Sequence, residues 1–252
     1  MQRRQRSTLA IVVGMFALTF VSAAESPAQN VSPAQNVSPA QNAPRILTPG
    51  DRFDALVRPD FFAGFAGDAA RLAKGMKACE EALAADPNHA GALVWHGGGL
   101  MFMAGQAARQ QDFQTARERA TRGREEMDRA YTLAPDSLNV MLVRAVVLNT
   151  AAPNVRDRAQ GRAMQQESVA GFEKALAIQT PYLARMSEHS RGELLAGLAE
   201  GWSRLGEADK ARGYLERITR ELPDSRYQAR ARAWLEDGPQ SGPLTCLTCH
   251  RE

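Results

Sequence analysis

Two cysteines and a histidine near the carboxyl terminus form the strongest chemical signal in the sequence. Cys246, Cys249 and His250 follow the pattern Cys-x-x-Cys-His. Two thiols three positions apart on one helical turn can both reach the vinyl groups of a porphyrin and form thioether bonds, and the adjacent imidazole then points at the iron. The motif therefore predicts one covalently attached haem c, with His250 as the proximal axial ligand of the iron.

Other chemistry is open to the same three residues. The two cysteines could cycle between a dithiol and a disulfide, or the motif could hold another metal ion or have no function. A zinc site is the poorer alternative, because only three ligands are local and a structural zinc site uses four.

The motif resembles the attachment site of cytochromes c, but the resemblance covers only these five residues. A cytochrome c domain begins near this motif and supplies a distal methionine downstream, whereas only Arg251 and Glu252 follow His250 here. We therefore expect no cytochrome c domain. The distal iron ligand is unknown; it would come from the preceding helices, from a partner, or be absent.

Three histidines and two methionines elsewhere are weaker candidates for that distal position. His96 lies at a helix position expected to face the partner helix, so a buried, hydrogen-bonded histidine is the simpler interpretation, and a distal ligand or groove residue is the alternative. His89 and His189 lie beside expected helix starts, and Met101 and Met103 have the spacing of core residues.

The amino terminus predicts export. Arg3, Arg4 and Arg6 precede an apolar stretch at 9–22, and small residues follow, as is typical of a Sec-type signal peptide over 1–24. A helix of that apolar stretch would rise about 21 Å, less than the roughly 30 Å hydrocarbon core, so an uncleaved anchor is the weaker alternative. We expect a periplasmic or secreted protein with no membrane span after cleavage.

Charge and composition narrow the classes of protein. The formal net charge of +3 comes entirely from the three leader arginines, so the mature chain is neutral and a nucleic-acid partner is not expected. With 44% apolar residues and three cysteines in 252 residues, the chain is neither collagen-like nor a disulfide-dense small protein, nor a polytopic membrane protein.

A low-complexity segment follows the leader. Residues 26–43 hold three copies of Ser-Pro-Ala-Gln-Asn, without charge or large apolar side chains. Nothing in such a segment offsets the entropy of ordering it. Residues 25–44 are therefore predicted to form a disordered linker, either a spacer that lifts the domain off a surface or a tolerated insertion.

The body, residues 45–237, has the apolar spacing of helices, and no convincing alternating strand occurs in it. The clearest repeat runs over 194–222, where Gly206 separates two apolar helical faces and Pro223 ends the second. The second half of this pattern recurs upstream at Gly75, Cys79, Ala82 and Pro87; at Gly123, Met127, Ala130 and Pro135; and at Ser168, Phe172, Ala175 and Pro181.

This pattern resembles the tetratricopeptide repeat. The resemblance implies an all-α solenoid of antiparallel helix pairs whose concave surface binds peptides or proteins. The repeats are longer than the standard of about 34 residues, so we expect longer or extra helices at 106–118 and 153–165. Cys79 takes an apolar position and is predicted to be a buried free thiol. Residues 225–235 are predicted to cap the stack, and 238–252 to form a flexible tail.

These features predict an exported scaffold that carries haem c and transfers electrons or docks in a periplasmic complex, with a redox or other protein partner bound in the repeat groove. The alternative is a protein-interaction adaptor without haem, whose Cys-x-x-Cys is a dithiol or metal site. An enzyme such as a haem peroxidase is the least favoured class, because no distal acid–base residues can be named.

Overall fold

The computed structural model describes residues 49–245, and these residues fold into helices without any strand. The all-α class expected from the sequence is therefore confirmed for this part of the chain. The α-helices are α1 (Pro49–Phe65), α2 (Ala69–Ala85), α3 (Ala90–Arg109), α4 (Phe113–Leu133), α5 (Leu138–Ala151), α6 (Arg158–Gln179), α7 (Glu188–Arg204), α8 (Ala208–Glu221) and α9 (Arg226–Asp237). Short 3-10 helices are η2 (Ala152–Asn154), η3 (Thr180–Arg185) and η4 (Pro239–Ser241).

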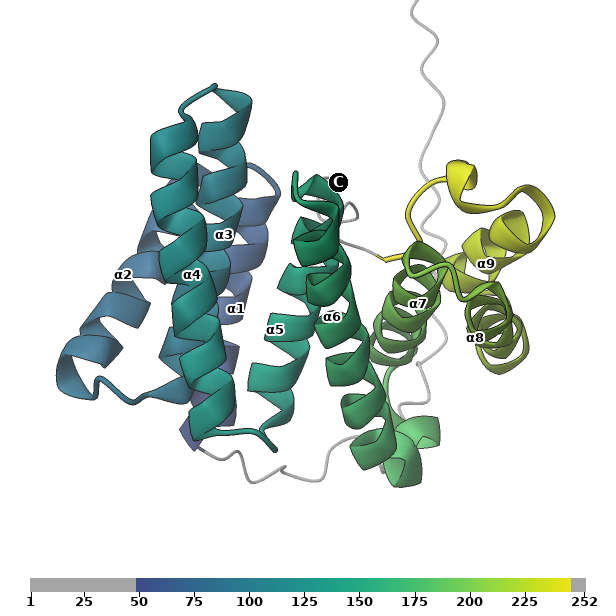
Figure 1. The fold of residues 1–252 in the computed structure, drawn as a ribbon. Helices are drawn as coiled ribbons and strands as arrows, with labels where there is room; N and C mark the ends of the chain where they lie inside the picture. Colours follow the sequence, from purple (N-terminus) through teal and green to yellow (C-terminus); the bar gives the residue numbers. More distant parts are fainter. Residues whose placement is uncertain (1–48, 246–252) are drawn as a thin grey trace, which may run out of the picture. The chain divides into compact units, whose positions relative to one another are not determined.

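Consecutive helices pack together in pairs, α1 with α2, α3 with α4, α5 with α6 and α7 with α8, and α9 packs on α8. The pairs succeed one another in chain order within the unit Ile46–Glu252 (Figure 1). Most of the helices begin at a polar side chain that accepts a hydrogen bond from a backbone N–H of the first turn, which is the usual device for starting a helix. These capping residues are Asp68, His89, Asp112, Ser137, Asp157, Ser187 and Ser225.

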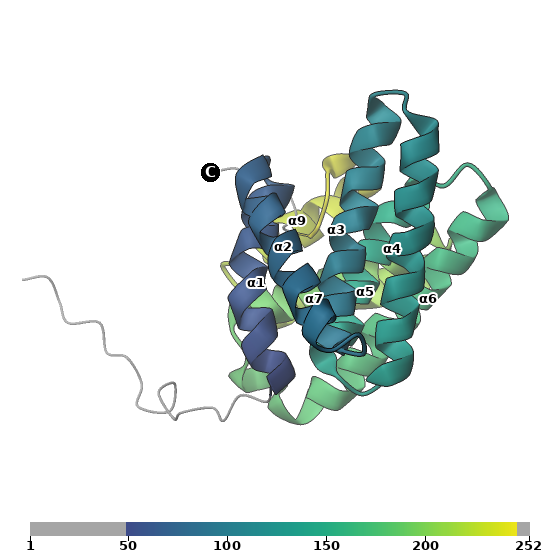
Figure 2. The same cartoon turned by 90° about the vertical axis from the view of Figure 1, so that its left-hand side faces the viewer.

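The stretches 106–118 and 153–165, where the sequence predicts longer or extra helices, lie largely within long helices. Residues 106–118 form the tip of the hairpin between α3 and α4, which are 20 and 21 residues long. This hairpin extends past its neighbours at one end (Figure 2). Residues 153–165 provide most of η2 and the first turns of α6, which has 22 residues.

The helices α3 and α4 approach each other at backbone distance. A Cβ atom added at Gly97 would lie 2.6 Å from the carbonyl oxygen of Gly123, and one added at Gly123 would lie 2.7 Å from that of Gly97. Only glycine fits at such a contact, because backbone atoms cannot move aside as a flexible side chain can. This contact explains the first glycine in the run 97–99, which would otherwise only weaken the helix.

Two apolar clusters fill the interior. We call the one built on α1 to α5, with Met164 from α6, the N-terminal cluster; its largest members are Phe61, Trp95, Met127 and Leu148. The C-terminal cluster is built on α5 to α9 and includes Phe172, Leu195, Leu198, Ile218 and Leu244. Helix α5 contributes to both, so it joins the two halves of the core.

A last helix at 226–237 and a buried thiol at Cys79 both match what the sequence predicts. Helix α9 begins one residue after Ser225 and packs at the end of the helical succession, which confirms a terminal helix there. Cys79 is a free, fully buried thiol, and burial together with the charges of Glu126 and Glu80 raises its pKa to about 12. None of the helices in residues 49–245 combines the length and apolar character that crossing a membrane requires.

Candidate functional site

The predicted haem-binding residues, Cys246, Cys249 and His250, lie outside the described residues, as do the leader and the linker. The structure describes the segment that leads to the motif. That segment returns from α9 across α7 (Figure 1). The candidate site is therefore built from the residues that receive it.

Residues 238–245 are not free, which corrects the expectation of a flexible tail for this part. Gly238 and Gly242 have φ values of +85° and +110°, a conformation that glycine adopts without strain, and they turn the chain on either side of η4. The indole Nε1 of Trp234 donates a 2.6 Å hydrogen bond to the carbonyl oxygen of Gly242. Arg230 donates through Nη1 to the carbonyl oxygen of Leu244 at 3.2 Å.

Glu200 binds the end of this segment through one carboxylate oxygen. Its Oε1 accepts hydrogen bonds from the backbone N–H groups of Leu244 at 2.7 Å and Thr245 at 3.1 Å, and from the Thr245 hydroxyl at 3.4 Å. The Leu244 side chain is fully buried in the C-terminal cluster. We call Glu200, Leu244 and Thr245 the tail anchor.

The second oxygen of Glu200 faces the helical body. Its Oε2 accepts from Asn149 Nδ2 at 3.3 Å and from Arg204 Nη2 at 3.2 Å. Asn149 in turn accepts from Gln165 Nε2 at 2.7 Å through its side chain and from Arg204 Nη1 at 2.8 Å through its carbonyl oxygen. A carboxylate that is only 2% exposed needs this many donors, since burying a charge without partners is strongly unfavourable.

The three described histidines differ in exposure: His96 is buried, His89 is half-buried and His189 is exposed. His96 is 2% exposed; its Nδ1 lies 2.5 Å from Glu126 Oε2 and its Nε2 lies 3.7 Å from Glu80 Oε1. His89 uses Nδ1 to accept from the backbone N–H of Ala92. His189 Nδ1 lies 2.9 Å from the hydroxyl of Tyr227. The simpler interpretation of His96, a buried and hydrogen-bonded histidine, is the one its surroundings support.

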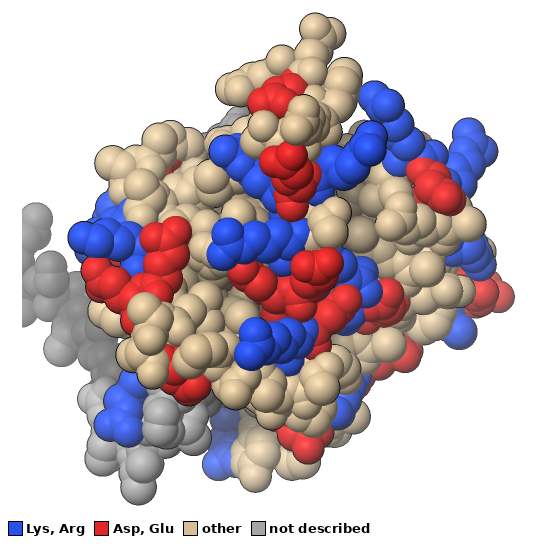
Figure 3. Space-filling view, turned by 60° about the vertical axis from the view of Figure 1, so that its left-hand side comes forward, with Lys and Arg blue, Asp and Glu red and all other residues tan. Residues whose placement is uncertain are grey.

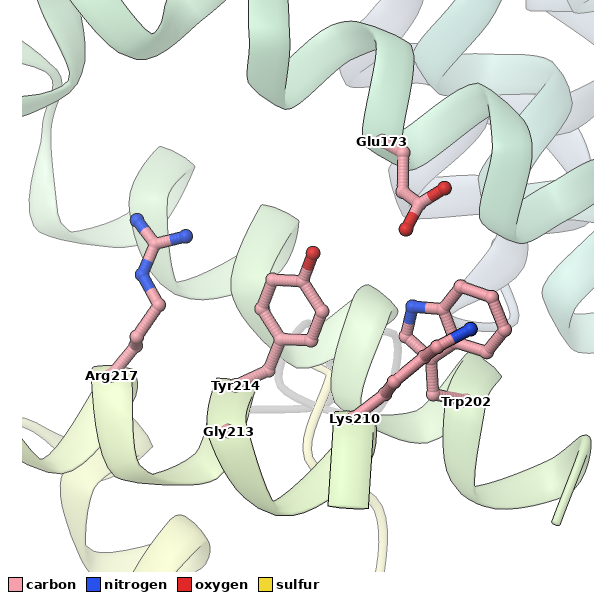
Figure 4. Close-up of a pocket in the computed structure, with 6 residues that line it drawn as sticks. All are labelled: Glu173, Trp202, Lys210, Gly213, Tyr214 and Arg217. Carbon is pink, nitrogen blue, oxygen red and sulfur yellow. The ribbon is translucent and has the colours of Figure 1, made fainter. Parts of the chain in front are cut away.

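A pocket of about 370 Å³ lies between α6, α7 and α8 (Figure 4). It is lined by Glu173, Trp202, Lys210, Gly213, Tyr214 and Arg217. The Lys210 ammonium lies 3.7 Å from the centroid of the Trp202 ring, and Trp202 Nε1 has no hydrogen-bond partner among the described residues. Burial and the negative charge of Glu173 raise the pKa of Tyr214, against the opposing effect of Arg217. The pocket therefore offers aromatic surface, hydrogen-bond donors and one carboxylate.

Charged side chains also form a network across α4, α5 and α6. Arg124 and Arg144 both pair with Asp128 and with Glu167. On the face shown in Figure 3, basic and acidic side chains lie side by side rather than in patches of one sign. Within residues 49–245 no three His, Cys, Asp or Glu side chains are grouped so that they could hold a metal ion.

Sequence reasoning missed Glu200. The signal was present, because Glu200 is the one acidic residue inside the run 194–201, every residue of which is buried. A charge in such a run implies a buried partner. The partner is the backbone of Leu244 and Thr245, which lie 44 and 45 positions further along the chain, and no spacing rule identifies so distant a contact. No family model, no curated protein and no solved structure matches this chain at a significant level.

Proposed function

We propose that this chain is an exported helical scaffold that carries one haem c directly after its tail anchor and serves electron transfer or docking in a periplasmic complex. Cys246 and Cys249 would form the thioether bonds, and His250 would bind the iron. The haem would supply one-electron chemistry, tuned by its second ligand and its solvent exposure.

The observation that carries the proposal is the tail anchor itself. A motif without a function does not require the residues before it to be fixed in place. Here the backbone of Leu244 and Thr245 is hydrogen-bonded to the buried carboxylate of Glu200, and the Leu244 side chain is buried in the core. The anchor gives the motif a defined starting point on the helical body, which suits a cofactor that has to meet a partner at a set place.

The succession of helix pairs supports the further part of the proposal, a tetratricopeptide-like solenoid with a protein partner. Stacked pairs bury a continuous core and leave extended surfaces for binding. The pocket beside Trp202 and Tyr214 gives such a partner an aromatic contact, and aromatic residues are enriched where protein interfaces are strongest.

The test is covalent haem itself. We expect the full chain, expressed in a bacterium together with its haem-maturation system, to retain a pyridine haemochrome spectrum after denaturation, with one porphyrin per chain by intact-mass spectrometry. The double variant Cys246→Ala/Cys249→Ala should lose the colour. The matched control, Cys79→Ala, removes the buried thiol and should keep it. Colourless wild-type protein would overturn the proposal.

The second candidate function is an adaptor without haem, favoured by the aromatic side chains of Trp202 and Tyr214 that line the pocket of Figure 4. In that case the wild-type protein is folded and colourless, and thiol titration finds Cys246 and Cys249 cycling between dithiol and disulfide.

A further inference from the structure

The pocket of Figure 4 has a counterpart between the preceding helices, and equivalent positions line both. We call the pocket of about 370 Å³ in Figure 4 the Trp202 pocket, and the pocket of about 170 Å³ between α4, α5 and α6 the Arg144 pocket. The helices α4, α6 and α8 share one register, marked by the buried residues Met127, Phe172 and Leu215. In that register, three residues of α6 that line the Arg144 pocket correspond to three residues of α8 that line the Trp202 pocket: Glu167 to Lys210, Ala170 to Gly213 and Gly171 to Tyr214.

The chain fills the Arg144 pocket with an arginine of its own. The Cζ atom of Arg144 lies 5.3 Å from the ring centroid of Tyr131, and its guanidinium pairs with Asp128 at 2.7 Å and also with Glu167. Only 11% of the Arg144 side chain is exposed. An arginine between an aromatic ring and a carboxylate combines a cation–π contact with charge-assisted hydrogen bonds. This pocket therefore shows which kind of group such a surface accommodates.

The Trp202 pocket keeps the acid but not that arginine. Asp128 corresponds to Glu173, which lines the Trp202 pocket. Arg144 corresponds to Leu198, because Arg144-Ala145 of α5 and Leu198-Ala199 of α7 hold the same place in the repeat. The Leu198 side chain is uncharged and fully buried. The larger pocket therefore has the acid of its counterpart without the guanidinium that neutralises it.

An aromatic ring is also kept, although it comes from another helix. Tyr214 of α8 lines the Trp202 pocket, as Tyr131 of α4 lines the Arg144 pocket. A second cation lies near each ring at a similar distance: Lys174 Nζ is 5.8 Å from the centroid of Tyr131, and Arg217 Cζ is 6.0 Å from that of Tyr214. The partner that Tyr131 has in Arg144 is the one that Tyr214 lacks among the described residues.

The charges that line the Trp202 pocket favour a cation as its occupant. Lys210 pairs with Glu207 at 3.9 Å, and Arg217 pairs with Glu221 at 3.0 Å, so acids outside the lining neutralise both of its cations. Within residues 49–245, Glu173 forms no ion pair. Its charge is felt across the pocket, because after burial it is the second cause that raises the pKa of Tyr214.

We propose that the Trp202 pocket binds an arginine side chain of a partner protein, with the guanidinium paired to Glu173 and packed against Tyr214. The carboxylate of Glu173 and the ring of Tyr214 are directed into the same opening from α6 and α8 (Figure 4). A guanidinium suits the site better than an ammonium, because its plane can stack on a ring while its edge binds a carboxylate. This inference rests on the part of the proposed function that gives the helical body a protein partner, and it does not involve the haem.

The probe is the capped tripeptide acetyl-Gly-Arg-Gly-amide, and binding is followed by NMR on the isotope-labelled full chain. The indole N–H signal of Trp202, assigned with the variant Trp202→Phe, reports on the pocket. The indoles of Trp95 and Trp234 are hydrogen-bonded elsewhere and serve as internal references. The titration is run on wild type and on Cys246→Ala/Cys249→Ala, which lacks the cysteines to which haem would attach.

We expect the arginine peptide to shift the Trp202 signal with a Kd on the order of 1 mM, because a single side chain makes the contact. The corresponding citrulline peptide, which has the same shape without the charge, should bind about fivefold more weakly. Glu173→Gln should weaken binding of the arginine peptide about fivefold, and Tyr214→Leu about threefold. The matched control, Glu216→Gln, removes an exposed acid of α8 outside the pocket and should leave the Kd unchanged.

The outcomes separate this inference from the haem proposal. Equal affinities for the arginine and citrulline peptides, an unchanged Kd in Glu173→Gln, or tighter binding of acetyl-Gly-Glu-Gly-amide would each overturn it. Saturable binding that Glu173→Gln weakens, seen in the variant without Cys246 and Cys249, supports it even where the wild type carries no haem. Wild-type protein that carries haem but does not bind the arginine peptide overturns this inference and leaves the haem proposal standing.

Discussion

The two apolar clusters each enclose a buried polar side chain, and they satisfy it differently. In the N-terminal cluster region His96 lies on α3 and meets Glu126 of α4 and Glu80 of α2, so neighbouring helices supply every partner. In the C-terminal cluster region Glu200 takes donors from α5 and α7, but two of its closest donors come from the tail. The first arrangement is complete within the helical pairs, whereas the second is complete only when the tail is in place.

Substitutions in the two regions should therefore affect stability on different scales. Substitutions around His96 act on helices that are part of the fold, so they should change the free energy of unfolding of the whole domain. Substitutions at Leu244 and Thr245 act on the segment that follows α9, which can detach while the helices stay folded, and this limits the free energy that is lost.

The largest expected effect is at the backbone contact between α3 and α4. Gly97→Val would place side-chain atoms against the carbonyl oxygen of Gly123, which cannot move aside, so we expect a loss of about 3 kcal/mol of unfolding free energy or more in urea denaturation. Gly105→Ala is the control in the same helix, because its Cβ would meet only the end of Arg109 at 3.6 Å. It should stabilise the protein by about 0.5–1 kcal/mol. Equal effects of the two variants would contradict the close contact.

The next effect tests the tail anchor as part of the core. Leu244→Ala removes a fully buried side chain from the C-terminal cluster, and we expect a loss of about 2 kcal/mol by the same measurement, at the low end for such substitutions because the tail can detach. Leu56→Ala, at a leucine that is 66% exposed, is the control and should change the free energy little. A null result at Leu244 would show that the tail adds nothing to stability.

The corresponding substitution in the N-terminal cluster region is Glu126→Ala. It leaves Nδ1 of the buried His96 without its closest partner, and an unsatisfied buried polar group costs about 1–3 kcal/mol. Hydrogen exchange in 242–245 should stay at the wild-type rate, since neither Glu126 nor His96 contacts the tail anchor. Faster exchange there would show that the two regions are coupled and would break the comparison.

A smaller effect is the loss of folding stability at acid pH, which we expect in both regions. Burial opposes ionisation of Asp60, but hydrogen bonds and charge from Arg71 and Lys74 outweigh it, and its pKa is lowered. Burial likewise opposes ionisation of Glu167, and Arg124 and Arg144 lower its pKa. A lowered folded-state pKa contributes stability above the unfolded value of about 4 and loses it as pH falls through the folded value. In Asp60→Asn and in Glu167→Gln, the urea concentration at the midpoint of unfolding should fall less steeply below pH 4 than it does in wild type. If both variants fall as steeply as wild type, the ion pairs of Asp60 and Glu167 with their basic partners do not contribute to stability.

The smallest effect concerns reactivity alone. The Cys79 thiol is fully buried with a pKa of about 12, so almost none of it is thiolate at pH 8. In the Cys246→Ala/Cys249→Ala variant, intact-mass spectrometry after iodoacetamide treatment at pH 8 should show no adduct on the folded chain and one adduct on the denatured chain. Rapid labelling of the folded chain would show that the N-terminal cluster opens.

Much of the fold follows from the sequence, because helical periodicity, caps and breakers are local. Gly206 ends one helix and Ser225 starts another as expected, and the stretches 106–118 and 153–165 lie largely within the long helices α3, α4 and α6. The tail was predicted differently because Gly238, Pro239 and Gly242 have the composition of a flexible stretch. Their turns bring Leu244 back to a surface 44 residues earlier in the chain, and composition carries no information about such a return.

Part of the candidate site can likewise be predicted from the sequence, and part of it cannot. The spacing of Cys246, Cys249 and His250 states its chemistry without any structure, and it stays a prediction. Glu200 and the side chains that hold it receive the two residues before the motif; they come from three helices, so only the folded chain brings them together.

The fixing of Thr245 shortens the range over which an electron carrier could travel. A tether free from Gly238 would let Cys246 sweep a radius of up to about 29 Å, whereas a chain held at Thr245 leaves it a single residue step of about 3.8 Å. Under the proposed function, a redox partner would have to come to this protein, and the shape of the surface that it meets, more than the length of any arm, would decide whether electrons are exchanged.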